Sequence, residues 1–133
     1  MPPIPPVTKV LMLICTAVFC LQFFVPLNLW FALWPPASGM FWPWQVLSYA
    51  FLHGGFGHLF FNGLALYMFG APLEMTWGRQ RFLTYFLVCV AGAGLIQLLV
   101  ATSGITGQGI YPTIGASGGV FGLLLAYGML FPN

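Results

Sequence analysis

Charged residues are almost missing from this chain. One acidic and three basic residues occur among 133, which is 3% of the sequence. A soluble domain carries about 25% charged residues, so this chain could not cover its surface in water. Hydrophobic residues make up 60% of it instead. The composition predicts an integral membrane protein in contact with membrane lipid, and three cations form no basic patch for nucleic acid.

Cysteine and histidine are scarce as well. The three cysteines, Cys15, Cys20 and Cys89, all lie in apolar runs, with no C-x-x-C spacing and no histidine nearby. This pattern gives no basis for a disulfide framework or a zinc site, and it favours plain packing residues. The two histidines, His53 and His58, have no suitable carboxylate or thiolate on their side of the membrane. They fall short of the usual ligand set, so we expect no metal.

The apolar runs that are present are long and do not alternate with period two. They predict helices, because lipid-exposed backbone must be hydrogen-bonded within its own segment. A helix needs about 20 residues to cross the hydrocarbon core, so the chain has room for about four spans. We expect an all-α multi-pass membrane protein with one domain over residues 1–133. Its parts are a proline-rich lead at 1–9 and spans at about 10–27, 57–75, 82–100 and 117–131.

Two of these segments have unusual features. Residues 28–52 hold four tryptophans and three prolines. Aromatic rings gather at the membrane–water interface and prolines prevent a continuous helix, so we expect a long, partly helical interfacial loop between the first two spans. The last span, at 117–131, measures roughly 22 Å at 1.5 Å per residue, less than the ~30 Å hydrocarbon core. It must therefore start or stop below a membrane surface, or thin the bilayer.

The positions of the cations predict the orientation. Lys9 precedes the first span, and Arg79 and Arg81 lie between the second and the third. The loops at 28–56 and 101–116 contain no lysine or arginine. By the positive-inside rule the N-terminus is cytoplasmic. Glu74 then lies on the inner side.

Polar residues begin the second and fourth spans, and the orientation places both beginnings on the outer side. His58 and Asn62 are four residues apart and share one helix face. Ser117 opens the fourth span inside Gly115-Ala116-Ser117-Gly118. A nucleophilic serine needs a base and donors for the oxyanion, and His58, Asn62 and the Ser117 backbone N–H offer such donors. The inner-side carboxylate cannot complete a Ser-His-acid triad.

Plainer interpretations stay open for the same residues. Gly115, Gly118 and two following glycines form G-x-x-x-G pairs, which are common helix-packing patterns. His58 and Asn62 are equally suited to an interhelical hydrogen bond without chemistry. His53 is expected to make backbone hydrogen bonds in the aromatic loop.

Taken together, the motifs follow one order along the chain: Trp44-Gln45, His53, His58-Leu59-Phe60-Phe61-Asn62, Glu74, Gly78-Arg79 and Gly115-Ala116-Ser117-Gly118. In this order and spacing they resemble the rhomboid intramembrane serine proteases. Each motif alone is weak. The combination of H-x-x-x-N, a second span, and G-x-S-G opening a short fourth span is specific. The resemblance covers about residues 8–133.

This resemblance implies a rhomboid-like helical bundle and a serine endopeptidase. Such an enzyme cleaves transmembrane-helix proteins near the outer membrane face and uses no cofactor. Ser117 would be the nucleophile, and His58 and Asn62 would form the oxyanion hole with the Ser117 backbone N–H. Glu74 and Arg79 would have structural roles near the inner face, and residues 28–52 would be the family's membrane-embedded first loop.

Two departures from the family are visible. Phe121 stands where many members have a tyrosine that packs on the catalytic histidine. More seriously, the family's general-base histidine comes from a sixth span, whereas this chain has no histidine after residue 58. The nucleophile and oxyanion donors are present and the expected base is absent. We therefore expect a C-terminally truncated, four-span part of a rhomboid that is inactive alone.

Alternatives remain. The chain could be a non-proteolytic relative that binds transmembrane helices through its glycine-rich faces, or His53 or His58 could act as the base in a dyad of another design. A small transporter or channel subunit is disfavoured, because four spans with no expected buried acid leave little for ion or proton coupling. The lack of an extra N-terminal domain or an arginine-rich transit segment favours a bacterial plasma membrane.

Overall fold

A computed structural model describes residues 3–103 and 112–131 of the chain, and these residues fold almost entirely into helices. No strand occurs in these two ranges. An isolated antiparallel bridge joins Leu33 to Thr113, with N–H to O distances of 2.9 Å in both directions. The all-α prediction is confirmed for this part of the chain.

Helix α1 (Pro6–Gln22) begins and ends earlier than the expected span at 10–27. Pro6 is the first helical residue, a position where proline is favoured because its missing N–H would have no helical partner. Helix α1 therefore starts inside the proline-rich lead. Pro26 cannot continue a helix, so residue 27 opens a new element instead.

The segment between the first two long helices is partly helical, as its composition predicts. It contains the short helices α2 (Leu27–Phe31), η1 (Pro36–Ser38), α3 (Gln45–Ser48) and η2 (Tyr49–Phe51). The buried side chain of Gln45 holds it together: its Nε2 donates to the carbonyls of Trp30 and Met40, and its Oε1 accepts from the N–H of Trp34. The Gln45 side-chain amide thus bonds to three backbone groups of this irregular segment, in place of the backbone partners that a regular helix or strand would supply.

The remaining helices follow the expected order with different ends. Helix α4 (Phe56–Ala65) continues through a π-helical turn, η3 (Leu66–Gly70), into α5 (Ala71–Trp77), which stops before Gly78 at φ 90°. Helix α6 covers Arg79–Ser103 and is longer than the expected 82–100, since nothing in the polar start at Arg79 breaks a helix. Helix α7 covers Ser117–Leu130.

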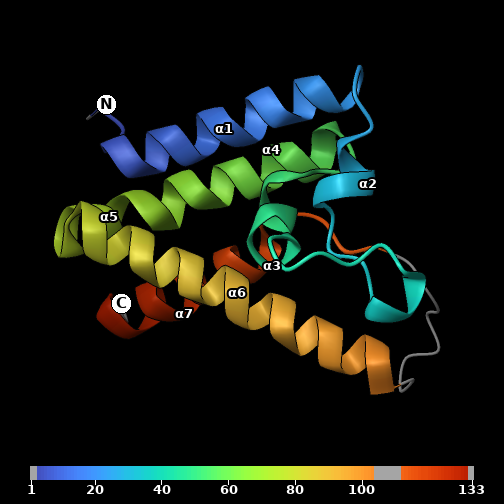
Figure 1. Cartoon of the computed structure of the whole chain (residues 1–133). Helices are drawn as coiled ribbons and strands as arrows, with labels where there is room; N and C mark the ends of the chain where they lie inside the picture. The colour runs from blue at the N-terminus through green and yellow to red at the C-terminus, as the bar shows by residue number, and fades with distance from the viewer. Residues whose placement is uncertain (1–2, 104–111, 132–133) are drawn as a thin grey trace.

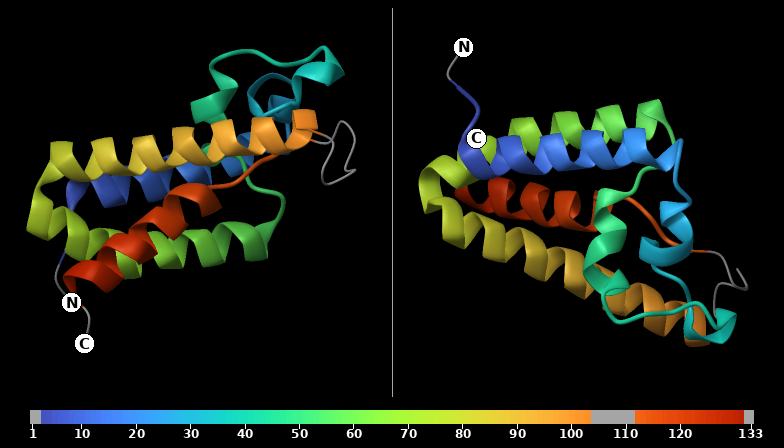
Figure 2. Two further views of the ribbon diagram at one scale, coloured as in Figure 1. Left: turned by 90° about the horizontal axis from the view of Figure 1, so that it is seen from below. Right: turned by 45° about the horizontal axis from the view of Figure 1, so that its top comes forward.

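The helices form a bundle with α7 between α6 and the α4–η3–α5 helix, while α1 lies along α4 (Figures 1 and 2). Glycines allow α7 to approach α6 closely: a Cβ on Gly118 would lie 2.5 Å from the Ala93 Cβ, and Cβ atoms on Gly119 and Gly122 would collide with Phe86 and Cys89. The small-residue face predicted for helix contact therefore packs against α6.

Only one helix in the described residues is long and apolar enough to cross a membrane by itself, over Arg79–Ala101 of α6. Helices α1 and α7 are apolar but shorter, with 17 and 14 residues. Helix α6 is thus a clear candidate for a membrane span, and the expected number of four spans stays a prediction.

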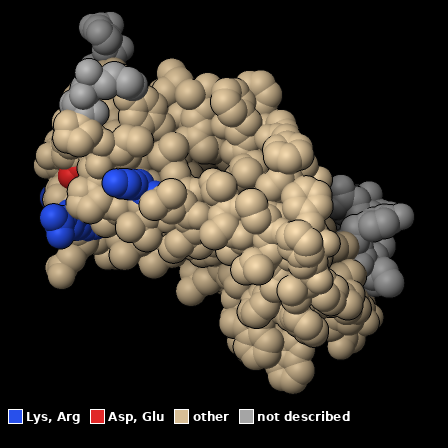
Figure 3. All heavy atoms as spheres, turned by 90° about the horizontal axis from the view of Figure 1, so that it is seen from above, with Lys and Arg blue, Asp and Glu red and all other residues tan. Residues whose placement is uncertain are grey.

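The charged residues lie at one end of the bundle (Figure 3). There Glu74, 3% exposed, accepts hydrogen bonds from the N–H groups of Val7 and Thr8 at 2.8 and 2.7 Å, and from the Thr8 hydroxyl at 2.8 Å. The carboxylate caps the first turn of α1, whose N–H groups have no helical partners. It joins the start of α1 to α5 across more than 60 residues of sequence.

Candidate active site

The loop before α7 takes a backbone conformation suited to glycine. Gly115 has φ 107°, and its N–H donates to the carbonyl of Tyr49 at 2.9 Å. A Cβ at this position would lie 2.6 Å from Cε1 and 2.7 Å from Nε2 of His58. The absence of a side chain at Gly115 therefore lets the His58 ring lie directly against the chain two residues before Ser117.

Ser117 meets Asn62 at the start of α7. The Ser117 hydroxyl donates to Asn62 Oδ1 at 3.4 Å, joining two helices 55 residues apart in sequence. Asn62 is 8% exposed, and its Nδ2 donates to the carbonyl of His58 at 2.8 Å. The amide carries two N–H groups, so one is still free to serve an oxyanion after this bond. The fold brings together the predicted nucleophile and both predicted side-chain donors.

The tautomer of His58 follows from its neighbour Gly54. The Gly54 N–H donates to His58 Nδ1 at 3.2 Å, so this nitrogen is an acceptor. A neutral imidazole then carries its proton on Nε2. Because Nε2 is the nitrogen beside Gly115, an N–H donor faces the start of α7. The part played by Gly54 was missed from the sequence; the Gly54-Gly55 pair just before the helix is the signal that could have suggested it.

His53 lies deeper than expected. Its backbone is held by Gln22 of α1, whose Oε1 accepts from the His53 N–H at 3.0 Å and whose Nε2 donates to its carbonyl at 2.9 Å. The side chain is 1% exposed, and neither ring nitrogen has a hydrogen-bond partner. Its ring centroid is 5.0 Å from that of His58. Burial, and then the nearby His58, lower the pKa of His53 from 6.5 to about 4, so its ring is neutral at pH 7.

The other predicted residues of the site separate into different surroundings. Gly118 faces α6, where its missing side chain also leaves room for the Tyr49 hydroxyl. Phe121 is 68% exposed and covers no histidine in the described residues. Glu74 lies twelve residues beyond Asn62 on the same helical path, about 18 Å away at 1.5 Å per residue. It is therefore no part of a triad with Ser117.

Two chemical functions are not supplied by the described residues. No imidazole among them hydrogen-bonds to the Ser117 hydroxyl, which has Asn62 as its partner. No group of three or more potential metal ligands occurs in them either. The arrangement can hold a serine hydroxyl beside N–H donors, which is the part of acyl-transfer chemistry that stabilises an oxyanion.

Comparison with known proteins identifies similar sequences. The family model described as Rhomboid domain matches residues 41–133. The Bacillus subtilis protein YdcA is 36% identical over 84 residues, which are 63% of this chain and 39% of that protein. Rhomboid-related protein 3 of Homo sapiens is 38% identical over 84 residues, 63% of this chain and 19% of its own length. Rhomboid protease GluP of Bacillus subtilis is 37% identical over 81 residues, 61% of this chain and 14% of its own.

Proposed function

The chain belongs to the rhomboid family, and from this premise and the surroundings of Ser117 we propose that it is part of an intramembrane serine endopeptidase. It would cleave transmembrane proteins near the outer membrane face. The matched segments cover well under two thirds of the relatives, so this activity is proposed for the complete protein.

The observation that carries the proposal is the contact between Ser117 and Asn62. Two polar side chains on different helices meet in a bundle where charged residues make up only 3% of the chain. His58 lies beside them, held against Gly115 with a nitrogen toward the start of α7. A packing role for the glycines explains Gly118 but gives no reason for the convergence of a hydroxyl, an amide and an imidazole.

The residues suggest the following chemistry. The Ser117 Oγ attacks a peptide carbonyl and its proton passes to a base. The carbonyl oxygen becomes an oxyanion that the His58 Nε2–H, an Asn62 N–H and the Ser117 backbone N–H stabilise. Collapse releases the amine half of the substrate, and water then hydrolyses the acyl-enzyme. Ser117 is the first residue of the short α7, so water would reach it from that end of the bundle, which is the outer end in the proposed orientation.

The base is proposed to lie outside residues 1–133. Both histidines of the chain precede Asn62, and His58 is occupied as a donor in this scheme. The neutral, buried ring of His53 is a weak base with a pKa of about 4 and is poorly suited to accept the proton of a serine.

The test is cleavage of a transmembrane reporter by the complete protein in vesicles. Ser117→Ala should reduce cleavage to the uncatalysed background, because the attacking oxygen is gone. Thr76→Ala is a matched control that removes an exposed hydroxyl bonded to the Pro72 carbonyl at the other end of the molecule, and it should leave the rate unchanged. Undiminished cleavage by Ser117→Ala would reject the nucleophile.

The isolated 133-residue chain provides the second arm of this test. It should bind no serine-directed phosphonate probe and release no product, since the base is missing. Turnover by the isolated chain would place the base within it and contradict the assignment. A complete protein that binds transmembrane helices but never cleaves them would favour the non-proteolytic alternative.

A further inference from the structure

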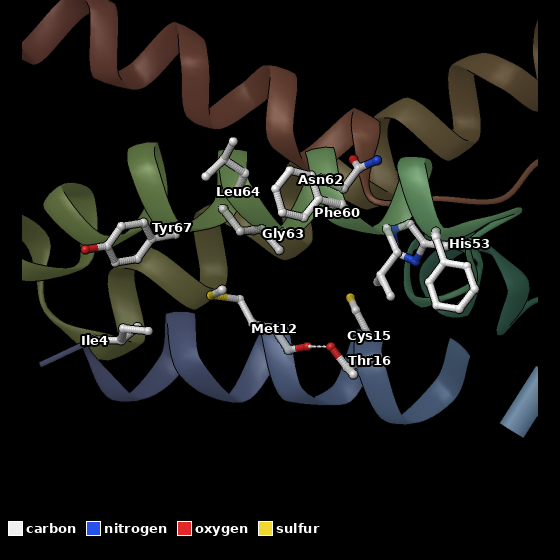
Figure 4. Close-up of a pocket in the computed structure, with 13 residues that line it drawn as sticks. Ile4, Met12, Cys15, Thr16, His53, Phe60, Asn62, Gly63, Leu64 and Tyr67 are labelled. Atoms are coloured by element: carbon white, nitrogen blue, oxygen red, sulfur yellow. Dashed lines mark hydrogen bonds between the residues drawn. The ribbon is translucent and has the colours of Figure 1, made fainter. Parts of the chain in front are cut away.

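A cavity of about 550 Å³ opens between α1 and α4, and it shares Asn62 with the proposed active site. Figure 4 shows Met12, Cys15 and Thr16 of α1 on one wall and Phe60, Gly63 and Leu64 of α4 on the other. Ile4 and Tyr67 lie at one end, and His53 and Asn62 at the opposite end. The cavity is a long, mostly apolar channel, with His53 and Asn62 at one end and the Tyr67 hydroxyl at the other (Figure 4).

Two polar side chains of the channel make hydrogen bonds within the protein. The Thr16 hydroxyl donates to the Met12 carbonyl at 2.9 Å, and Asn62 is bonded to the His58 carbonyl. Both ring nitrogens of His53 are buried without a partner at ordinary hydrogen-bond geometry, although the ring also lies close to the Phe51 backbone. A buried polar group without a partner is unfavourable, and a ligand with a polar atom at this end would supply one.

The size and lining of the channel restrict what it can hold. A helix with its side chains is about 10 Å across, so this volume would accommodate only about one turn. Flexible, thin molecules with an apolar body fit better. The walls belong to helices of a membrane protein family, so the hydrocarbon region of the bilayer is the adjacent solvent.

We propose that this channel binds one acyl chain of a membrane phospholipid, with the ester carbonyl at His53 and the chain running between α1 and α4 toward Ile4. The neutral imidazole supplies an N–H to the carbonyl oxygen. His53 precedes α4, whose first turn lies at the end of the bundle away from α5 and Glu74 (Figure 1). In the proposed orientation this is the level of the ester groups of an outer-leaflet lipid. The proposal requires a bilayer and does not depend on proteolysis.

The occupant is identified by photo-crosslinking. The complete protein is reconstituted in vesicles of phosphatidylethanolamine and phosphatidylglycerol with a trace of phosphatidylcholine that carries a diazirine in one acyl chain. After irradiation, labelled peptides are located by mass spectrometry. Label should concentrate in peptides containing Met12 to Thr16 and Leu59 to Tyr67. Label spread evenly over all lipid-facing helices would overturn the proposal.

Variants separate a specific channel from general lipid contact. A Cβ on Gly63 meets nothing within 4 Å, so Gly63→Leu fills the channel without a backbone collision. It should reduce labelling of α1 to the level of the outer face of α6. Gly92→Leu adds the same side chain to an equally open position of α6 and should leave α1 labelling unchanged. Equal labelling in both variants would contradict a bound chain in the channel.

His53→Phe keeps a ring of similar shape and removes the polar atoms. Losing one hydrogen bond should reduce labelling about fivefold, with the label still in the same peptides. This variant also serves if Gly63→Leu does not fold. Crosslinks from a diazirine amino acid placed at Gly63 to another segment of the protein, and not to lipid, would show that protein fills the channel and would reject the proposal.

Discussion

The conformation of Gly115 is the most local requirement of the site. Its φ of 107° strains any residue with a side chain, and its Cβ would press on the His58 ring. Gly115→Ala should therefore move His58 and lower reporter cleavage by the complete protein about five- to thirtyfold, since a backbone strain of roughly 1–2 kcal/mol would displace this oxyanion donor. Cleavage rate and thermal unfolding are measured together.

Gly128→Ala is the matched control for this substitution. Gly128 lies in α7, and a Cβ there meets nothing within 4 Å. The variant should retain full activity and unfold at the same or a higher temperature, because alanine favours helices more than glycine does. Equal activity of both variants would mean that the contact between Gly115 and His58 has no role in cleavage.

The buried ring of His53 makes stability depend on pH. Its pKa is lowered from 6.5 to about 4 in the folded protein by burial and by His58, so the unfolded chain binds the proton more tightly. Stability is fully present above about pH 6.5 and should fall as pH decreases toward about 4. Denaturant unfolding of the protein in detergent micelles across this range measures the effect.

His53→Phe isolates this contribution, because the substituted ring does not titrate. Its unfolding free energy should change less between these pH values than that of the unchanged protein. Parallel pH profiles for the two proteins would show that the buried histidine does not carry the dependence.

At the scale of helices, Glu74 ties α1 to α5. Three hydrogen bonds converge on a buried carboxylate, and each bond to a charged group contributes about 1.5–3 kcal/mol. Glu74→Ala should destabilise the protein by about 3 kcal/mol or more, because it leaves the first turn of α1 without its cap. Unfolding in detergent micelles gives the difference.

Thr8→Val provides the graded comparison, since it removes only the hydroxyl bond and keeps the shape of the side chain. It should cost about 1 kcal/mol. Glu74→Ala with an effect no larger than that of Thr8→Val would mean that the backbone N–H groups of α1 gain nothing from the carboxylate.

At the scale of the whole molecule, the charged residues and the candidate site lie toward opposite ends of the bundle, and we expect these ends to face opposite sides of the membrane. We predict that Ala37 is outside and Gln80 inside, because Arg79 and Arg81 flank the latter. In a background with all three native cysteines replaced by alanine, an impermeant maleimide on intact cells should label Ala37→Cys and not Gln80→Cys. Both positions are exposed in the protein, so either could react. The reverse pattern would invert the proposed orientation.

Local sequence was enough to predict the class of the protein and its main helices. Near-absence of charge required a lipid environment, and long apolar runs required helices, because both properties act residue by residue along the chain. The ends of the helices were harder to predict. The proline-rich lead was expected to precede the first span, yet α1 begins at Pro6. Proline is unfavourable inside a helix but favourable at its first position.

Sequence alone also determined the candidate site as a set of residues, because H-x-x-x-N and G-x-S-G are local patterns. Only the tertiary structure decided how they meet. The Gly115 conformation, the Gln22 bonds to His53 and the Glu74 cap on α1 each join segments far apart in the chain. Local propensity contains no information on such distant partners. The channel between α1 and α4 likewise exists only after both helices have packed, since its volume belongs to neither helix alone.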